Sequence, residues 1–293
     1  MRIIEPSELI LNKDGSVFHL HMLPEDLAKD VILVGDPGRV DLVASYFDKI
    51  DCSRSNREFV TKTGYYKGKR ITVLSTGIGT DNIDIVVNEL DALANINLKE
   101  RTVKPTHTSL NLMRIGTSGA LQGDIPVGSA VLSQMSIGFD GLLNFYARRN
   151  EVCNLEMEQA FIKFMNWNEQ CAKPYFVEAS PILCEKMKAF TIEGITISAP
   201  GFYGPQGRVL RLPLADAQLN EKIESFRYNG RKITNFEMES SAIAGLSKLL
   251  GHQAVTMVTI LVSTFKFQSK TADQDYLSTT YAYHILNRVK VQT

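Results

Sequence analysis

The fold class is decided by the stretch Val31-Ile32-Leu33-Val34-Gly35-Asp36-Pro37-Gly38-Arg39. Its first four residues are apolar and mostly β-branched, a pattern typical of a buried strand, and Gly35 ends that strand. Ligands of α/β sheets usually lie at the carboxyl ends of strands. The glycines leave the backbone open to an anion and Arg39 offers a forked cationic donor, so this strand end has groups that suit an anion.

The same alternation of short apolar runs and amphipathic stretches continues along the chain. It predicts further strands at 71–75, 112–115, 131–132, 195–198 and 254–261, and helices at 82–94, 155–167, 181–190, 215–227, 238–250 and 278–290. Such alternation indicates an α/β architecture in which helices cover a sheet. We expect residues 99–108 to form a solvated surface loop. No repeat or linker divides the sequence, so we expect one domain over residues 1–293.

The composition excludes several classes of protein. Lysine plus arginine and aspartate plus glutamate both number 32, so the neutral chain has no broad basic surface for nucleic acid or an anionic membrane. No apolar run is long enough to span a bilayer, and the first residues lack a signal-peptide pattern. The four cysteines are far apart without a Cys-x-x-Cys, which favours reduced thiols and a cytoplasmic location.

Two more predicted strand ends carry glycine-rich turns, Ser75-Thr76-Gly77-Ile78-Gly79-Thr80 and Arg114-Ile115-Gly116-Thr117-Ser118-Gly119. Each turn alone is typical of an ordinary loop. Three such turns at strand ends, two with an arginine and one with a threonine hydroxyl, together predict a shared oxyanion site.

Other motifs for phosphate or nucleophile chemistry fit less well. The pair Gly77-x-Gly79 lacks the third glycine of a dinucleotide fingerprint because position 82 is asparagine, and no Gly-Lys-Ser/Thr of a P-loop occurs. The run from Gly116 to Ala120 approaches the Gly-x-Ser-x-Gly elbow of serine hydrolases. Its last position is alanine, however, and no helix is predicted to follow it.

A pair of carboxylates lies in Glu237-Met238-Glu239-Ser240, ahead of the helix predicted at 238–250. Side chains at i and i+2 are expected to diverge, so the two glutamates do not suit the paired acid and base of a glycosidase. One carboxylate can accept a hydrogen bond from each hydroxyl of a cis-diol. The chemistry of the segment alone is equally typical of acidic residues at a helix start.

Taken in order, four segments resemble the nucleoside phosphorylase family, and specifically its uridine phosphorylase branch. They are Val34–Val40, Ser75–Gly79, Arg114–Ala120 and Asn235–Ser240, and the resemblance runs from about residue 17 to residue 265. It implies a single three-layer α/β domain with a central mixed β-sheet flanked by helices. It also implies an enzyme, a pentosyltransferase that cleaves nucleosides with inorganic phosphate.

The resemblance assigns roles residue by residue. The positions that match phosphate ligands are Gly35, Arg39, Arg57, Arg114 and Thr117. Those that match ribose ligands are His19, Met238, Glu239 and, as a weaker match, Glu237. The base-binding positions are Phe202, Gln206, Arg208, Ser118 and Gly119, with Gln206 and Arg208 in the branch signature Phe202–Arg208. The residues expected to act directly in catalysis are Arg114, Arg208 and Glu239.

Two of these residues are expected to serve a neighbouring subunit. In the family, the arginine at the position of Arg57 reaches the neighbour's phosphate, and the histidine at the position of His19 reaches its ribose 5′-hydroxyl. The resemblance therefore implies a homodimer or a hexamer built as a trimer of dimers, with shared active sites. His19-x-His21 would place both rings on one face of a strand, but without a third ligand nearby we expect no metal site.

The expected reaction is phosphorolysis of uridine to uracil and ribose 1-phosphate, in nucleoside salvage or catabolism, with deoxyuridine and thymidine left open as substrates. No organic cofactor is implied, although Glu58 and Ser75 match positions that hold a monovalent cation in some relatives. A hydrolytic nucleosidase or a nucleoside-binding protein would not need the phosphate arginines.

A purine phosphorylase would need an acid shortly after the strand at 254–261, and Leu261-Val262-Ser263-Thr264-Phe265 has none. The uridine enzymes tend to have Asn-Arg where this chain has Ser263-Thr264. That departure leaves the orientation of uracil open.

Overall fold

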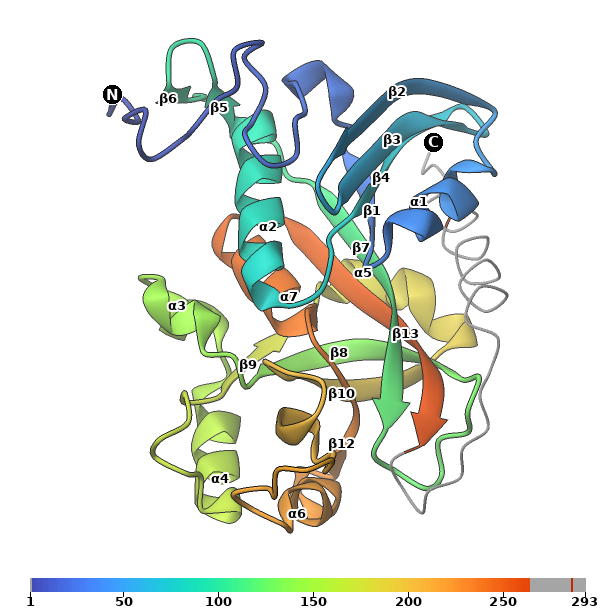
Figure 1. The fold of residues 1–293 in the computed structure, drawn as a ribbon, viewed down its shortest axis with the longest axis vertical. Helices are drawn as coiled ribbons and strands as arrows, with labels where there is room; N and C mark the ends of the chain where they lie inside the picture. Colours follow the sequence, from blue (N-terminus) through green and yellow to red (C-terminus); the bar gives the residue numbers. More distant parts are fainter. Residues whose placement is uncertain (1, 264–285, 287–293) are drawn as a thin grey trace.

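The computed structural model describes residues 2–263 and Leu286. In this part of the chain one large mixed sheet runs through the molecule, and Figure 1 shows its long central strands β7 and β13 joining the two ends. The strands of this sheet are β1 (Asp30–Val34), β2 (Lys49–Asn56), β3 (Phe59–Tyr66), β4 (Lys69–Ser75), β7 (Asn111–Ala120), β8 (Ala130–Gly138), β9 (Tyr175–Glu178), β10 (Ile192–Ser198), β11 (Arg227–Tyr228), β12 (Arg231–Glu237) and β13 (Gln253–Ser263). The described helices are α1 (Pro37–Ala44), α2 (Thr80–Asn95), α3 (Arg149–Val152), α4 (Leu155–Met165), α5 (Pro181–Met187), α6 (Leu219–Ser225) and α7 (Ser240–Leu249).

The pairing of the strands makes the sheet mixed. Strand β1 lies parallel between β4 and β7, and β13 is parallel to β7 but antiparallel to β8. Strands β2 and β3 extend the sheet as an antiparallel hairpin. This arrangement confirms the predicted α/β fold with a central mixed sheet flanked by helices.

The strand that decided the fold class is buried on both faces. Alternate residues of a strand point to opposite sides, and here Val31 and Leu33 pack in the cluster that contains α2 and α7. Ile32 and Val34 pack in the cluster that contains α1 and α5. A strand with a helix layer on each side must be apolar at every position, which explains the unbroken run Val31–Val34.

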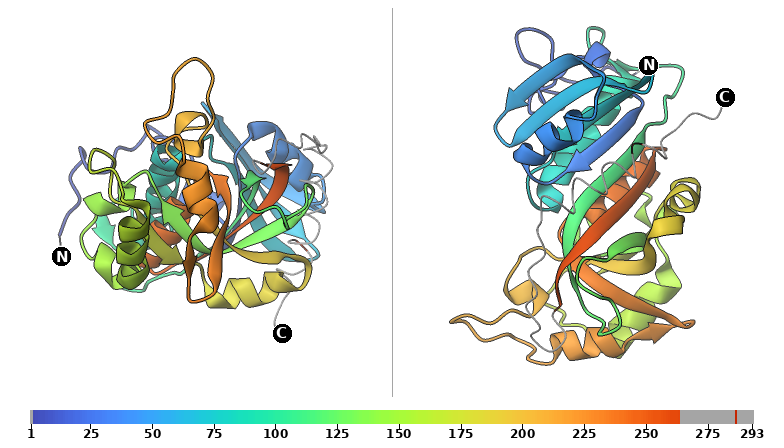
Figure 2. Two further views of the ribbon diagram at one scale, coloured as in Figure 1. Left: turned by 90° about the horizontal axis from the view of Figure 1, so that it is seen from below. Right: turned by 90° about the vertical axis from the view of Figure 1, so that its right-hand side faces the viewer.

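The second half of the sheet has its own cluster of buried aromatic side chains. Phe161 of α4 makes edge contacts with Phe176 of β9 and with Phe226, which follows α6. These helices lie at the lower end of the view in Figure 1. The loop that joins β10 to α6 projects from this end, as both views in Figure 2 show.

The structure differs from the sequence prediction at β7. We expected a strand that ended at Gly116, but β7 continues to Ala120 because its backbone pairs with β13 as far as Ser263 and with β12 at Gly119 and Ala120. Residues 116–119 are therefore part of a strand. The prediction of a turn there was wrong. Binding of an anion by these residues stays a prediction, because in the described structure residues 116–118 pair with β13 on one edge, while β12 pairs with β7 only at Gly119 and Ala120.

Several elements are shorter than predicted or were missed. The helix predicted at 215–227 is only α6, because Arg227 and Tyr228 pair with β12 as strand β11. The hairpin β2–β3 and helix α1 were not predicted. The loop at 99–108 includes a short pairing of β6 (Thr102–Val103) with β5 (Ile96–Asn97). The helix predicted at 278–290 lies outside the described residues, apart from Leu286.

No helix in the described part of the chain is long and apolar enough to span a membrane. All four cysteines are described, and each is a free thiol.

Candidate active site

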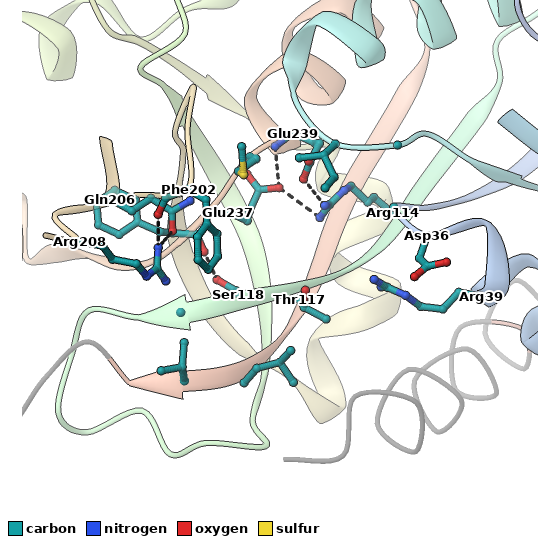
Figure 3. A pocket seen from close by; sticks show the side chains of 18 of the residues that line it. Asp36, Arg39, Arg114, Thr117, Ser118, Phe202, Gln206, Arg208, Glu237 and Glu239 are labelled. Atoms are coloured by element: carbon teal, nitrogen blue, oxygen red, sulfur yellow. Dashed lines mark hydrogen bonds and ion pairs between the residues drawn. The ribbon is translucent and has the colours of Figure 1, made fainter. Parts of the chain in front are cut away.

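A cavity of about 580 Å³ opens where β1, β7 and β13 meet the segment that joins β12 to α7. Figure 3 shows Arg39 and Arg114 at one side of it, Phe202, Gln206 and Arg208 at the other, and Glu237 and Glu239 between them. The structure brings together most of the residues expected from the sequence. Those that line the cavity are Gly35, Arg39, Arg114, Thr117, Ser118, Gly119, Phe202, Gln206, Arg208, Glu237, Met238 and Glu239. The lining that sequence reasoning missed includes Asp36, Ile78, Phe236, Leu261 and Val262.

Arg39 is positioned by the start of helix α1. Asp36 is the N-cap, and its side chain accepts a hydrogen bond from the Gly38 N–H at 2.7 Å. Pro37 follows as the first helical residue, where its fixed φ suits a helix start. Arg39 therefore leaves the first turn of α1 as a buried side chain that borders the cavity.

Arg114 forms ion pairs with both glutamates of the Glu-Met-Glu segment. One guanidinium nitrogen lies 3.1 Å from Glu237 Oε2, and another pairs with Glu239 Oε2. The prediction that the two carboxylates diverge was wrong. Strand β12 ends at Glu237, and Glu239 has the φ of −139° and ψ of −26° of a helix-capping residue, so the chain bends between them.

The two glutamates have different partners. Glu237 accepts hydrogen bonds from the N–H groups of Glu239 and Ser240 and from the hydroxyls of Ser198 and Ser240, at 2.6–3.0 Å. It fixes the bend that begins α7. Among the described residues, Glu239 accepts a hydrogen bond from the Gly79 N–H, at 2.7 Å, besides its contact with Arg114. Glu239 is thus the carboxylate that can exchange partners when a diol enters.

Burial changes the acidity of Glu239. All three charged side chains are at most 5% exposed, and two carboxylates share one guanidinium, so the group holds an excess negative charge. Burial, the largest effect, raises the pKa of Glu239 to about 7, and nearby Glu237 raises it further, while Arg114 opposes the change. The Glu239 carboxyl is therefore protonated in part of the molecules near neutral pH.

Gly116 makes room for the arginine. Residues 114 and 116 lie on the same face of β7, and a Cβ at Gly116 would collide with the guanidinium of Arg114. The glycine of Arg114-Ile115-Gly116 therefore serves the packing of a cationic side chain.

At the other side of the cavity, Arg208 is held by its own loop. One guanidinium nitrogen donates to the Phe202 carbonyl and to Gln206 Oε1, both at 2.6 Å. The guanidinium also lies 3.9 Å from the centre of the Phe202 ring, a cation–π geometry. Partial burial lowers the pKa of Arg208. This clamp orients Arg208 through Phe202 and Gln206. Of the pair Ser263-Thr264, which stands where uridine enzymes tend to have Asn-Arg, Thr264 lies outside the described residues.

Ser118 borders the cavity, but its hydroxyl is hydrogen-bonded to neighbouring residues of the protein. Its hydroxyl donates to the Phe236 carbonyl at 2.5 Å and accepts from Asn235 at 2.7 Å, so these contacts tie β7 to β12. We expected Ser118 among the base-binding residues. Its hydroxyl is already engaged with the backbone beside the cavity.

His19 and Arg57 do not line the cavity. The turn of His19 contacts the β2–β3 hairpin, because Asn56, the residue before Arg57, donates its side-chain N–H to the His19 carbonyl at 2.8 Å. Arg57 has a φ of 53° at the tip of the β2–β3 hairpin. His19 lies in a turn, and His21 has a φ of 54°, so the expectation of a strand with both rings on one face was wrong.

Glu58 and Ser75, the pair matched to a monovalent cation, are adjacent. The Ser75 hydroxyl donates to the Glu58 carbonyl at 2.6 Å and accepts the Val60 N–H at 2.7 Å. The Glu58 carboxylate accepts from the Asn82 side chain at 3.2 Å. The oxygens gathered here are of the hard type that alkali cations prefer.

One histidine cluster was not expected from the sequence. Asp91, His107 and His252 offer atoms that all lie within 4.8 Å of one another. However, Nδ1 of His252 accepts the Leu110 N–H at 3.2 Å, so the neutral ring carries its proton on Nε2, which lies 3.1 Å from Asp91. A metal ligand would need a lone pair at that nitrogen. The contact is therefore a link between α2 and the start of β13.

Comparison with known proteins identifies the family of the chain. The family model of the phosphorylase superfamily matches residues 29–276. A uridine phosphorylase of Thermococcus kodakarensis is 29% identical over 250 residues, 83% of this chain and 76% of its own. A DeoD-type purine nucleoside phosphorylase of Thermoanaerobacter pseudethanolicus is 37% identical over 127 residues, 43% of this chain and 48% of its own.

Among solved structures, a Trypanosoma brucei nucleoside phosphorylase described as showing uridine phosphorylase activity superposes with a TM-score of 0.81. It is 27% identical, and the match covers 96% of this chain and 98% of the other. The match to the family model spans most of the chain and includes every residue that lines the cavity. The chain belongs to the phosphorylase superfamily.

Proposed function

We propose that this protein is a uridine phosphorylase, which cleaves uridine with inorganic phosphate to uracil and ribose 1-phosphate. The observation that carries the proposal is the order of groups in one cavity: arginines with Thr117 at one side, Glu239 in the middle, and the Gln206–Arg208 clamp at the other. These groups complement an anion, a diol and the polar edge of a base, in that sequence. The similarity to uridine phosphorylases over most of the chain supports the same assignment.

The proposed mechanism relies on position and charge. Arg39, Arg114 and Thr117 hold phosphate below C1′, while Glu239 accepts hydrogen bonds from the 2′- and 3′-hydroxyls. As the bond from C1′ to N1 stretches, the phosphate charge stabilises the cationic sugar, and phosphate attacks from the face opposite the base. Arg208 stabilises the negative charge on the leaving uracil. The configuration at C1′ is inverted, and the enzyme needs no covalent intermediate.

The choice of a pyrimidine rests on the base side of the cavity. A leaving purine requires a proton at N7, and in the described lining the acidic residues are Asp36, Glu237 and Glu239, all away from the Gln206–Arg208 clamp. Gln206 offers an amide donor and acceptor that match a uracil edge. The partial match to a purine enzyme is consistent with the shared phosphate and ribose segments of the superfamily.

The proposal includes a homo-oligomer with shared sites, either a dimer or a trimer of dimers. Its support is that neither His19 nor Arg57 lines the cavity of its own chain, while Asn56 links the turn of His19 to the hairpin of Arg57. A cytoplasmic location in nucleoside salvage fits the four free thiols. A monovalent cation at Glu58 and Ser75 would lie beside Arg57, where it would brace the same hairpin.

A panel of nucleosides assayed with and without phosphate tests the activity. We expect phosphate-dependent release of base from uridine, with inosine and adenosine turned over at least ~100-fold more slowly, a discrimination typical of unpaired buried polar groups. Base release that is independent of phosphate would identify a hydrolase. Release from purine nucleosides alone would overturn the assignment of the base.

A variant of the phosphate side separates phosphate binding from folding. Thr117 is half-buried, so Thr117→Val keeps the shape while removing one hydroxyl. We expect the KM for phosphate to rise about 10-fold, the usual effect of one hydrogen bond to a charged group. The KM for uridine should stay within twofold. Arg114 is a poorer choice, because its loss strands two buried carboxylates.

A further inference from the structure

Glu89 of α2 is a buried carboxylate outside the cavity described above. Its oxygens accept the backbone N–H of His19 at 3.0 and 3.1 Å and that of Leu20 at 2.8 Å. Oε1 also lies 2.7 Å from His19 Nδ1. Among the ion pairs of the described residues, Glu89 pairs with His19 alone. In the described structure, the hydrogen bonds and the ion pair of the Glu89 carboxylate therefore go to the turn at His19 and Leu20.

This contact selects one form of the imidazole ring. A carboxylate accepts hydrogen bonds but does not donate them, so Nδ1 of His19 carries the proton and the neutral ring keeps its lone pair on Nε2. The rings of Phe18 and Phe59 meet the imidazole edge-on, at 4.9 and 6.5 Å between centroids. The side chain is still 28% exposed. The ring is thus held at one nitrogen and bordered by two aromatic rings, while part of it faces solvent.

The same turn is joined to the arginine hairpin. Asn56 binds the His19 carbonyl, and Arg57 is the next residue. Glu89 therefore fixes the imidazole relative to the side chain that we propose reaches the neighbour's phosphate. In the proposed reaction, inorganic phosphate must lie close to C1′ of the nucleoside, and the 5′-hydroxyl lies on the same sugar. A rigid link between Arg57 and His19, the residues proposed to bind phosphate and the 5′-hydroxyl, would keep the two substrates in register.

We propose that Glu89 is a positioning residue for recognition of the nucleoside 5′-hydroxyl, acting through His19 across the subunit boundary. The inference rests on the proposed function. With Nδ1–H bound to Glu89, Nε2 accepts the O–H of the 5′-hydroxyl, and the charged partner strengthens that acceptor. The substrate class is then nucleosides with a free 5′-hydroxyl, and 5′-deoxynucleosides bind without this hydrogen bond.

Glu89→Gln tests the proposal with uridine and 5′-deoxyuridine as paired substrates. A glutamine has one acceptor oxygen where three N–H groups now converge, so its amide would turn toward Nδ1 and move the ring proton to Nε2. We expect kcat/KM for uridine to fall about 10-fold, mainly through KM, while the value for 5′-deoxyuridine changes less than twofold. Equal losses for both substrates, or an unchanged ratio, would overturn the proposal.

The His19→Ala background is the matched control. His19→Ala should remove the preference for uridine over 5′-deoxyuridine. Adding Glu89→Gln to His19→Ala should then leave the ratio of the two kcat/KM values unchanged, because the two residues act as one unit. A further change in the ratio would mean that Glu89 acts elsewhere. Thermal midpoints of all four proteins separate this effect from a loss of folding.

A measurement on the unaltered protein covers the case in which Glu89→Gln does not fold. Histidine labelled with ¹⁵N reports the ring tautomer, and the His19→Ala spectrum assigns the signal. We expect the Nδ1–H tautomer for His19 at pH 8, and the Nε2–H tautomer would overturn the proposal. If the unaltered protein shows no phosphate-dependent cleavage of uridine, the proposed function fails, whatever this spectrum shows.

Discussion

At the scale of single residues, the group formed by Arg114, Glu237 and Glu239 controls the centre of the cavity. Glu237 is bound by the backbone of the bend, whereas Glu239 shares Arg114 and one N–H group. In the proposed reaction, an incoming phosphate competes with Glu239 for Arg114, and an incoming ribose offers Glu239 two hydroxyls in exchange. Binding of both substrates then leaves each buried charge with a partner.

The raised pKa of Glu239 makes stability depend on pH. Its folded value of about 7 lies above its usual 4.5, so between these values the folded state binds more protons than the unfolded state. This contribution to stability is present below pH 4.5 and is lost as the pH rises through 7.

We therefore expect the unfolding free energy to fall more between pH 5.5 and pH 8 in the unaltered protein than in Glu239→Gln. Urea unfolding in phosphate-free buffer measures both. An identical pH dependence in the two proteins would show that Glu239 is ionised throughout this range.

At the scale of elements, strand β7 supplies one side of the cavity. Its inward positions alternate along the strand, with Arg114, Gly116 and Ser118 on one face. The strand is held by β13 along its length, by β1 as far as Ile115 and by β12 at its end. A rigid strand of this kind holds a catalytic arginine more firmly than a loop would.

Gly116→Ala tests this element. The added Cβ collides with the guanidinium of Arg114, and we expect the arginine to leave Glu239. Phosphorolysis should fall at least ~10-fold, with stability reduced by about 1–3 kcal/mol. Ile115→Val, on the opposite face of β7, is the control and should cost about 1 kcal/mol without loss of activity. Normal KM for phosphate in Gly116→Ala would contradict the role assigned to the glycine.

At the scale of the whole molecule, His19 and Arg57 lie outside the lining of their own chain's cavity. These two residues can bind substrate if a second copy of the chain brings the surface that carries them to the first copy's cavity, as we propose. In a two-fold symmetric dimer the same surface would then serve both sites.

Mixed oligomers test whether sites are shared. Arg208→Ala lacks a residue of its own cavity, and Arg57→Ala lacks the donated one. Co-expressed in equal amounts, they should form mixed dimers with one intact site each, so that roughly a quarter of the sites regain full activity. Activity no greater than the mean of the two separate variants would show that each chain completes its own site.

Much of the fold and of the cavity follows from local patterns in the sequence. The run Val31–Val34 predicted a buried strand because it is short, mostly β-branched and followed by Gly35. The ordered motifs with Gln206 and Arg208 predicted much of the cavity lining. The sequence could not predict that β7 continues through Gly116, because hydrogen bonds from β12 and β13, far away in the chain, extend it.

By itself, the sequence determined the α/β class, the family and most residues of the cavity, because these depend on periodicity and on motifs read along the chain. Only the tertiary structure decided the partners of those residues: that Glu237 and Glu239 converge on Arg114, that Phe202 and Gln206 hold Arg208, and that Glu89 holds His19. Each of these contacts depends on how the chain bends or on residues far apart in it. Burial of the resulting groups, which sets the pKa of Glu239, exists only once the layers have packed.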